Sequence, residues 1–220
     1  MIAPSDSRLP RLIAIDVDGT LLGAGFAVSD RTARVLKRVA AAGSVIVLVT
    51  GRSPRKLTRV FAELGTRYAA ICANGAIVFH PAEDQPRSCR MLEPAQAREV
   101  CRLIQEQVPE VMFAAEVDGR LLHNPGWPLR HEDPDIARAV RLEELIATQL
   151  VKLQARAPGH NSDSFNKLVT DAVGHLVEAT CPGFEGLVEM TQRGVTKASA
   201  LVALAEELGI KSADTLAFGD

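Results

Sequence analysis

Two aspartates separated by one residue are the side chains of this 220-residue chain best placed for chemistry, and both lie in the stretch Asp16–Thr20 (DVDGT). The apolar run Leu12–Ile15 comes directly before them, as in a buried parallel strand, and a glycine follows. In open parallel α/β sheets, reactive groups gather at the carboxyl ends of strands. The pattern therefore predicts that Asp16 and Asp18 lie at the sheet edge where an active site is expected.

A second pair of aspartates with the same spacing occurs in Asp133–Asp135. No apolar run precedes it, and a proline separates the two acids, so we interpret it as a solvated turn or a helix start. Spacing alone is thus a weak signal, whereas spacing combined with a strand and a glycine turn is a specific one.

Other polar groups follow predicted strands or begin a predicted helix: Thr50, Gly51, Arg52, Asn74, Lys197 and Asp220. Because parallel strand ends meet at one edge, these groups are expected to converge on one crevice. Carboxylate oxygens favour Mg²⁺, which takes one or two protein carboxylates and keeps several waters. A hydroxyl and a lysine can hold the oxygens of a phosphoryl group in flight. The set predicts phosphoryl transfer, with Gly51, Arg52 and Asn74 as substrate contacts; for Arg52 and Asn74, a structural role in their loops is an equal alternative.

Strands and helices alternate in the N-terminal part of the chain. Helices are predicted from Ser29 to about Ala42 and from Pro54 to Gly65, next to the apolar strands Val45–Val49 and Tyr68–Ala73. After residue 190 the pattern resumes with a helix and the short apolar strand Thr215–Phe218. This βαβαβ order predicts an α/β fold whose core is a doubly wound, Rossmann-like parallel sheet.

The segment 86–190 has a different pattern, with alternating strands, a helix over Glu93–Val108 and a hairpin turn at Asp118-Gly119. It predicts an inserted α/β domain, with residues 1–85 and 191–220 forming the core domain. The strand Leu150–Ala157 alternates between an apolar face and a polar face. The polar face is predicted to point to solvent in preference to a substrate, and it carries Lys152, Gln154 and Arg156.

Composition excludes several function classes. The chain has 25 basic and 27 acidic residues and a net charge of −2, with no basic block that favours nucleic acid or a membrane surface. No apolar segment is long enough to span a bilayer, and the polar N-terminus does not resemble a signal peptide, so we expect a cytoplasmic protein. The four cysteines have no zinc-site spacing. No feature indicates a particular oligomeric state.

These motifs resemble those of the haloacid-dehalogenase-like phosphatase superfamily. Asp16–Thr20 resembles the first motif, and Thr50, Lys197 and Gly219-Asp220 resemble the second, third and fourth motifs in the expected order. The phrases around Thr50 (VTGR), Asn74 (ANGA) and Lys197 (GVTKA) resemble the Cof-type branch. That branch carries a large α/β cap domain between its second and third motifs, the interval in which 86–190 lies.

The resemblance implies a role for each matching residue. Asp16 is the nucleophile, and Asp18 is the general acid for the leaving alcohol and then the base for water. Thr50 holds phosphoryl oxygens, and Lys197 offsets negative charge. Mg²⁺ is held by Asp16, the backbone carbonyl of Asp18, and Asp220. The fourth motif continues in the family to a further acidic residue, and the last strand has nothing to cover it, so we expect the natural protein to be longer.

This set of residues predicts a Mg²⁺-dependent phosphatase that acts on a small phosphorylated metabolite. Sugar phosphates are the substrate class that we expect first. The reaction proceeds through an aspartyl-phosphate, as the resemblance implies. A phosphomutase of the same superfamily is the nearest alternative. A non-catalytic protein that accepts or binds phosphate, such as a signalling receiver domain, is a second alternative, although such domains are much shorter and lack an inserted cap.

Overall fold

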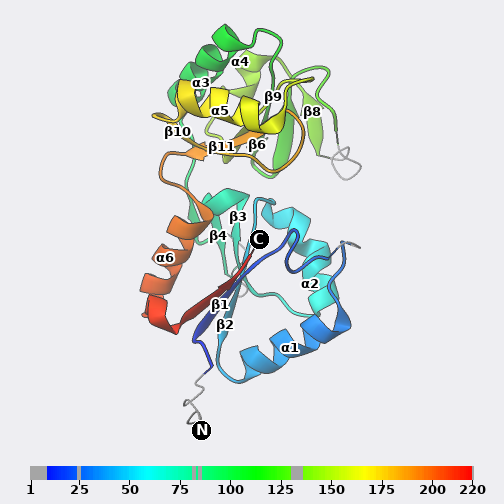
Figure 1. Ribbon diagram of the computed structural model, residues 1–220, viewed down its shortest axis with the longest axis vertical. Helices are drawn as coiled ribbons and strands as arrows, with labels where there is room; N and C mark the ends of the chain where they lie inside the picture. The colour runs from blue at the N-terminus through cyan, green and yellow to red at the C-terminus, as the bar shows by residue number, and fades with distance from the viewer. Residues whose placement is uncertain (1–8, 24–25, 81–82, 84–85, 130–135, 220) are drawn as a thin grey trace. The chain divides into compact units, whose positions relative to one another are not determined.

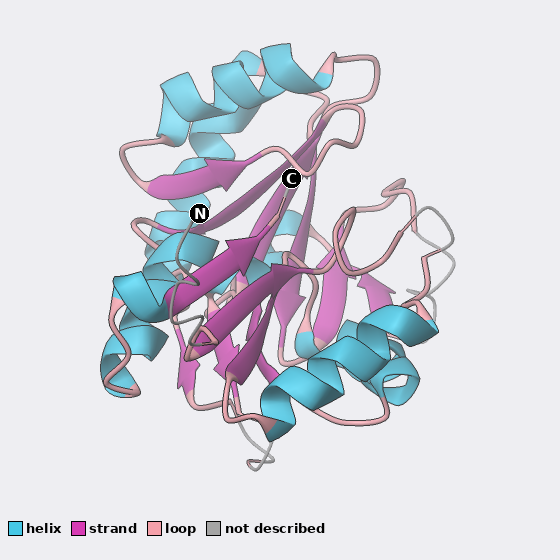
Figure 2. Cartoon of the chain, turned by 60° about the horizontal axis from the view of Figure 1, so that its bottom comes forward, coloured by secondary structure: helices cyan, strands magenta, loops and turns pink. Residues whose placement is uncertain are grey.

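The computed structural model describes residues 9–23, 26–80, 83, 86–129 and 136–219. Asp220 and the pair in Asp133–Asp135, which we assigned from the sequence, lie outside these residues. The chain divides into two compact units, which we call the first unit (Met1–Arg87 with Lys197–Asp220) and the second unit (Ser88–Thr196). Both units combine helices with strands (Figure 2).

The first unit is built on a mainly parallel sheet with the strand order β12-β1-β2-β3-β4. The pairs β1–β2, β2–β3 and β1–β12 are parallel, whereas β3–β4 is antiparallel. The bounds of the strands are β1 (Leu12–Asp16), β2 (Val45–Val49), β3 (Ala69–Cys72), β4 (Ile77–Phe79) and β12 (Thr215–Phe218). Every residue of β3, and all but one of β1 and of β2, is buried, as expected for parallel strands covered on both faces.

Helices of the first unit lie on both sides of this sheet (Figure 1). Helix α1 (Asp30–Ala41) begins after Ser29, whose hydroxyl accepts the Thr32 N–H at 3.1 Å. The turn η1 (Pro54–Leu57) leads into α2 (Thr58–Leu64), which ends at Gly65 with a φ of 65°. The remaining elements are α6 (Lys197–Glu207) and the short turns η2 (Ala73–Gly75) and η3 (Ser212–Asp214).

Helix α6 packs on one face of the sheet, where Ala200 and Leu204 join a buried cluster with Leu12, Val47 and Ile71. Helices α1 and α2 lie on the other side (Figure 1). The doubly wound arrangement predicted from the alternating strands and helices is therefore the one observed.

The second unit contains a separate sheet with the order β10-β11-β9-β6-β7-β8. All its pairs are antiparallel except β7–β8. Its strands are β6 (Met112–Val117), β7 (Arg120–His123), β8 (Ala137–Ala139), β9 (Lys152–Arg156), β10 (Val177–Thr180) and β11 (Leu187–Gln192). The two-residue strand β5 (Ser88–Cys89) opens the unit, and its helices are α3 (Pro94–Gln107), α4 (Leu142–Leu145) and α5 (Ser162–Val173).

The two faces of this second sheet differ in chemistry. On one face, Phe113, Leu153 and Val188 pack with residues of α3 and α5 into a large buried core. The other face carries Lys152, and here the sequence prediction is wrong, because Lys152 is only 2% exposed and does not point to solvent. The reason is cross-strand pairing: its ammonium lies between two carboxylates, 2.8 Å from Glu189 and 3.4 Å from Glu116.

In the part of the chain that the structure describes, no helix has both the length and the apolar character needed to cross a bilayer.

Candidate active site at the ends of strands β1 and β2

Asp16 ends strand β1 and forms an ion pair with Lys197, the first residue of α6. The Lys197 Nζ donates to Asp16 Oδ1 at 2.5 Å, although 181 residues separate the two in the chain. A cation at a helix N-terminus is disfavoured by the helix dipole, so this position needs another source of stabilisation. The carboxylate of Asp16 supplies it, and the pair joins the predicted first and third motifs.

Asp18 lies two residues farther on and is held by Arg52. The Arg52 Nε lies 2.9 Å from Asp18 Oδ2, and its second terminal nitrogen lies 2.5 Å from Oδ1. This two-pronged geometry fixes the orientation of a carboxylate more firmly than a single bond. The Asp18 side chain nevertheless remains half-exposed, with 51% of its surface accessible, so it can reach a proton on a bound molecule.

Thr50 follows strand β2 and is almost fully buried, at 1% exposure. Its hydroxyl accepts the Arg52 N–H at 3.1 Å and lies 3.5 Å from Asp18 Oδ2. Gly51, between the two, is half-buried. The structure thus brings Thr50, Gly51 and Arg52 to the same place as Asp18, as the convergence of parallel strand ends predicts.

Asn74 belongs to the turn after β3, which is tied to the turn after β2 through the backbone. The Asn74 N–H donates to the Thr50 carbonyl at 3.1 Å, and the Ala73 N–H donates to the Arg52 carbonyl at 2.8 Å. Ala73 and Asn74 have φ angles of 49° and 57°, in the left-handed region that is costly for an alanine. Strained backbone of this kind gathers at functional sites, where the surrounding bonds hold it in place.

Two observations extend the set. A Cβ placed on Gly219 would lie 3.7 Å from the Asp16 Cβ, so the end of β12 reaches the same edge as Asp16; Asp220 itself is outside the described residues. Ser53, which the sequence pattern missed, is 4% exposed, and its hydroxyl has no hydrogen-bond partner among the residues that the structure describes. A buried hydroxyl without a partner is uncommon and calls for an explanation such as a ligand or water. The only sequence signal for Ser53 is its position directly after Arg52.

The donor set at this edge fits Mg²⁺ in its chemistry. Asp16 offers a carboxylate oxygen and Asp18 a backbone carbonyl oxygen, and Mg²⁺ takes one or two protein carboxylates and retains waters. Within the described ranges, no group of three or more histidine, cysteine, aspartate or glutamate side chains is arranged to hold a metal ion. The described residues therefore fit a partly hydrated magnesium ion better than a closed metal cage.

Known structures share this fold. The chain matches a phosphatase from Bacteroides thetaiotaomicron, BT1666, with a TM-score of 0.79 and 23% identity, over 100% of this chain and 80% of that one. It matches the subclass IIB sugar phosphatase BT4131 with a TM-score of 0.78 and 20% identity, over 96% and 80% of the two chains. These likenesses confirm the predicted fold class, a mixed α/β fold with a parallel core.

Curated sequences give a closer relation. An HMP-PP phosphatase from Enterobacter sp. (strain 638) is 27% identical over 224 residues, which cover 96% of this chain and 78% of that protein. A sequence profile of the haloacid dehalogenase-like hydrolases matches residues 13–220, which includes every predicted site residue. The resemblance seen in the motifs is thereby confirmed: the chain belongs to the haloacid dehalogenase-like hydrolases.

Proposed function

We propose that this hydrolase is a magnesium-dependent phosphatase that acts on phosphate monoesters of small metabolites through an aspartyl-phosphate on Asp16. The observation that carries the proposal is the placement of Asp16, at a strand end, paired with Lys197 and beside Asp18. The phosphatase activity named for the Enterobacter relative supports the reaction class.

In the proposed reaction, a carboxylate oxygen of Asp16 attacks phosphorus while the bond to the leaving alkoxide breaks. Asp18 donates a proton to the oxygen of the leaving group, so that the product leaves as a neutral alcohol. Asp18, now ionised, accepts a proton from water as the water attacks the phosphorus of the aspartyl-phosphate, which restores Asp16 and releases phosphate. Lys197 and the Thr50 hydroxyl stabilise the charge on the phosphoryl oxygens.

Magnesium would be held by Asp16, by the Asp18 carbonyl and by Asp220, and it would neutralise charge on the phosphoryl group. Arg52 holds the Asp18 carboxylate and so orients the group that transfers the proton. We propose Gly51, Arg52 and Asn74 as the substrate contacts. We also propose that the second unit, Ser88–Thr196, is the inserted cap domain.

The test is Asp16→Asn, with Asp171→Asn as the matched control. Asp171 is an exposed aspartate of α5 that pairs with the surface lysine Lys167, so its loss should not affect turnover. Asp16→Asn should reduce the hydrolysis of p-nitrophenyl phosphate by more than about a thousandfold, because an amide cannot form the acyl-phosphate. Activity retained by Asp16→Asn would refute the nucleophile assignment.

A panel of phosphorylated metabolites, with sugar phosphates first, would then give the substrate class. Each reaction is followed both for free inorganic phosphate and for an isomeric phosphate ester. Release of phosphate supports the phosphatase, whereas an isomerised ester without release identifies a phosphomutase. Magnesium dependence is tested with EDTA and re-addition of Mg²⁺, and full turnover in EDTA would exclude it.

A further inference from the structure

A cavity in the first unit lies apart from the residues of the proposed reaction. It has a volume of about 600 Å³, within the range that holds small organic ligands. Its lining comes from η1, α2, β3, β4 and the segment between α2 and β3. The lining includes Pro54, Phe61, Ala62, Arg67, Cys72 and Phe79. None of Asp16, Asp18, Thr50 and Lys197 is among the lining residues.

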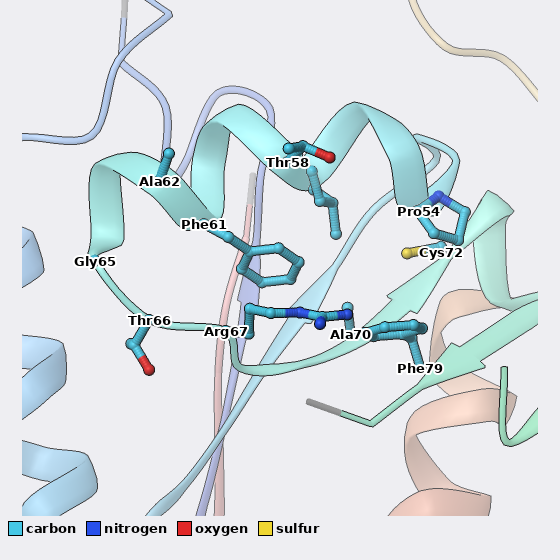
Figure 3. Close-up of a pocket in the computed structure, with 11 residues that line it drawn as sticks. Pro54, Thr58, Phe61, Ala62, Gly65, Thr66, Arg67, Ala70, Cys72 and Phe79 are labelled. Carbon is cyan, nitrogen blue, oxygen red and sulfur yellow. The ribbon is translucent and has the colours of Figure 1, made fainter. Parts of the chain in front are cut away.

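The cavity combines flat apolar surfaces with one cation. Figure 3 shows the side chains of Phe61, Arg67 and Phe79 gathered in the same space. The Arg67 guanidinium carbon lies 4.8 Å from the centre of the Phe79 ring, a cation–π contact that holds its plane in place. No carboxylate of the described residues pairs with Arg67, whereas the neighbouring Arg59 of α2 pairs with Glu63 at 2.9 Å.

This composition selects a type of ligand. An apolar wall favours an apolar body, and the Phe61 ring together with the Arg67 guanidinium plane on Phe79 favours a flat one that can stack. A guanidinium without a carboxylate partner favours an anionic head group, which it can bind with two parallel hydrogen bonds. We propose that this cavity is a second binding site, separate from the catalytic one, for a small flat aromatic anion.

The position of the cavity gives such a ligand contact with two functional segments. Pro54 lies two residues after Arg52, and Cys72 lies two residues before Asn74. Pro54 and Cys72 both line the cavity, and Figure 3 labels both. A ligand there would lie behind the two turns that carry the proposed substrate contacts.

The test uses two fluorescent dyes that share an aromatic body and differ in charge. 8-Anilinonaphthalene-1-sulfonate carries an anionic sulfonate, and N-phenyl-1-naphthylamine lacks it. Both should bind the folded protein, with the sulfonate dye saturating at one molecule per chain. Because Arg67 meets only the sulfonate, Arg67→Gln should weaken binding of the anionic dye about tenfold and change binding of the neutral dye by less than about twofold.

Two further variants complete the test. Ala62→Trp places a large side chain in the cavity from an exposed helix position, so it should abolish tight binding of both dyes. Arg59→Gln, the matched control outside the cavity, should bind both dyes as the parent does. Asp16→Asn should also retain binding, which separates this proposal from the proposed catalytic function. Unchanged affinity for the anionic dye in Arg67→Gln, unchanged affinity for both dyes in Ala62→Trp, or loss of binding in Asp16→Asn would each overturn the proposal.

Discussion

The sheets of the two units place their polar groups in opposite ways. In the first unit the parallel strands β1 and β2 are apolar up to their carboxyl ends, where the polar groups lie: Asp16 is the last residue of β1, and Thr50 directly follows β2. In the second unit the polar groups lie within the strands, where Lys152 of β9 stands beside Glu116 of β6 and Glu189 of β11. One sheet therefore keeps charge at its edge, and the other buries charge on a face.

This difference explains why the positions of the polar groups could be predicted from the sequence in the first unit but not in the second. A parallel sheet covered on both faces needs apolar residues throughout, so a polar residue at a strand end stands out. In an antiparallel sheet, alternation is the ordinary pattern, and a lysine on the polar face carries no signal of its own. Charged residues therefore indicate a candidate site in the sequence of the first unit, but they give no such indication in the second.

The largest expected effects test whether the two units have independent cores. Phe113 of the second unit and Leu48 of the first unit are both fully buried. Phe113→Ala should destabilise its unit by about 3–5 kcal/mol and Leu48→Ala by about 2–5 kcal/mol, through lost burial and the cavity left behind. Hydrogen exchange measured peptide by peptide should show lost protection in the mutated unit alone. Equal loss in both units would mean that they unfold as one.

A buried charge should be the next most sensitive feature. Lys152→Met leaves the carboxylates of Glu116 and Glu189 buried together without a cation, which should cost about 3 kcal/mol in the free energy of unfolding. The triple variant Lys152→Met, Glu116→Leu, Glu189→Leu removes the charges altogether and should recover most of the loss. Denaturant unfolding of the three proteins decides it, and a triple variant less stable than Lys152→Met would contradict the argument.

The same lysine gives a pH dependence whose sign can be worked out. Burial alone would lower the pKa of Lys152, but the carboxylates of Glu116 and Glu189 outweigh burial, so the pKa is raised above its ordinary value. The stabilisation is then complete below the unfolded pKa of about 10.4 and is lost as the pH rises toward the folded pKa. Thermal unfolding between pH 9 and 11 should show the parent losing more stability than Lys152→Met, and parallel losses would refute this.

Rules that depend on neighbouring residues predicted the ends of helices. They failed for side chains whose partners lie far away in the sequence. The start of α1 at Ser29 and the end of α2 at Gly65 follow from capping chemistry within a few residues. The ion pair between Asp16 and Lys197 could be expected only from the order of motifs, because 181 residues separate them. The pairing of Arg52 with Asp18, and the burial of Lys152, depend on strand register that no local pattern contains.

Smaller changes in the free energy of unfolding are expected at the N-cap residue of a helix in each unit. Ser29 caps α1 in the first unit, and Asn161 caps α5 in the second by accepting the Asp163 N–H at 2.9 Å. Each change to alanine should cost about 1 kcal/mol, because the N–H of Thr32 in α1, or those of Asp163 and Ser164 in α5, lose the capping oxygen. Urea unfolding measures the loss, and Ser29→Gly and Asn161→Gly should lose less than the alanine variants. A loss above that of Lys152→Met would show that the caps have tertiary roles.

The smallest effect is expected for a lysine that pairs with a carboxylate, as Lys152 does, but lies on the solvent-exposed surface. Lys167 of α5 donates to Asp171 at 2.6 Å, a shorter contact than Lys152 makes with Glu189, but its side chain is 77% exposed. Water screens this pair and each ion keeps its hydration, so Lys167→Met should change the free energy of unfolding by less than about 0.5 kcal/mol. Urea unfolding of Lys167→Met and of Lys152→Met compares the two pairs, because the same substitution is made in both. If both variants lose the same stability, then burial does not set the strength of these ion pairs, and the buried charge of the second sheet is no more sensitive than a charge on the surface.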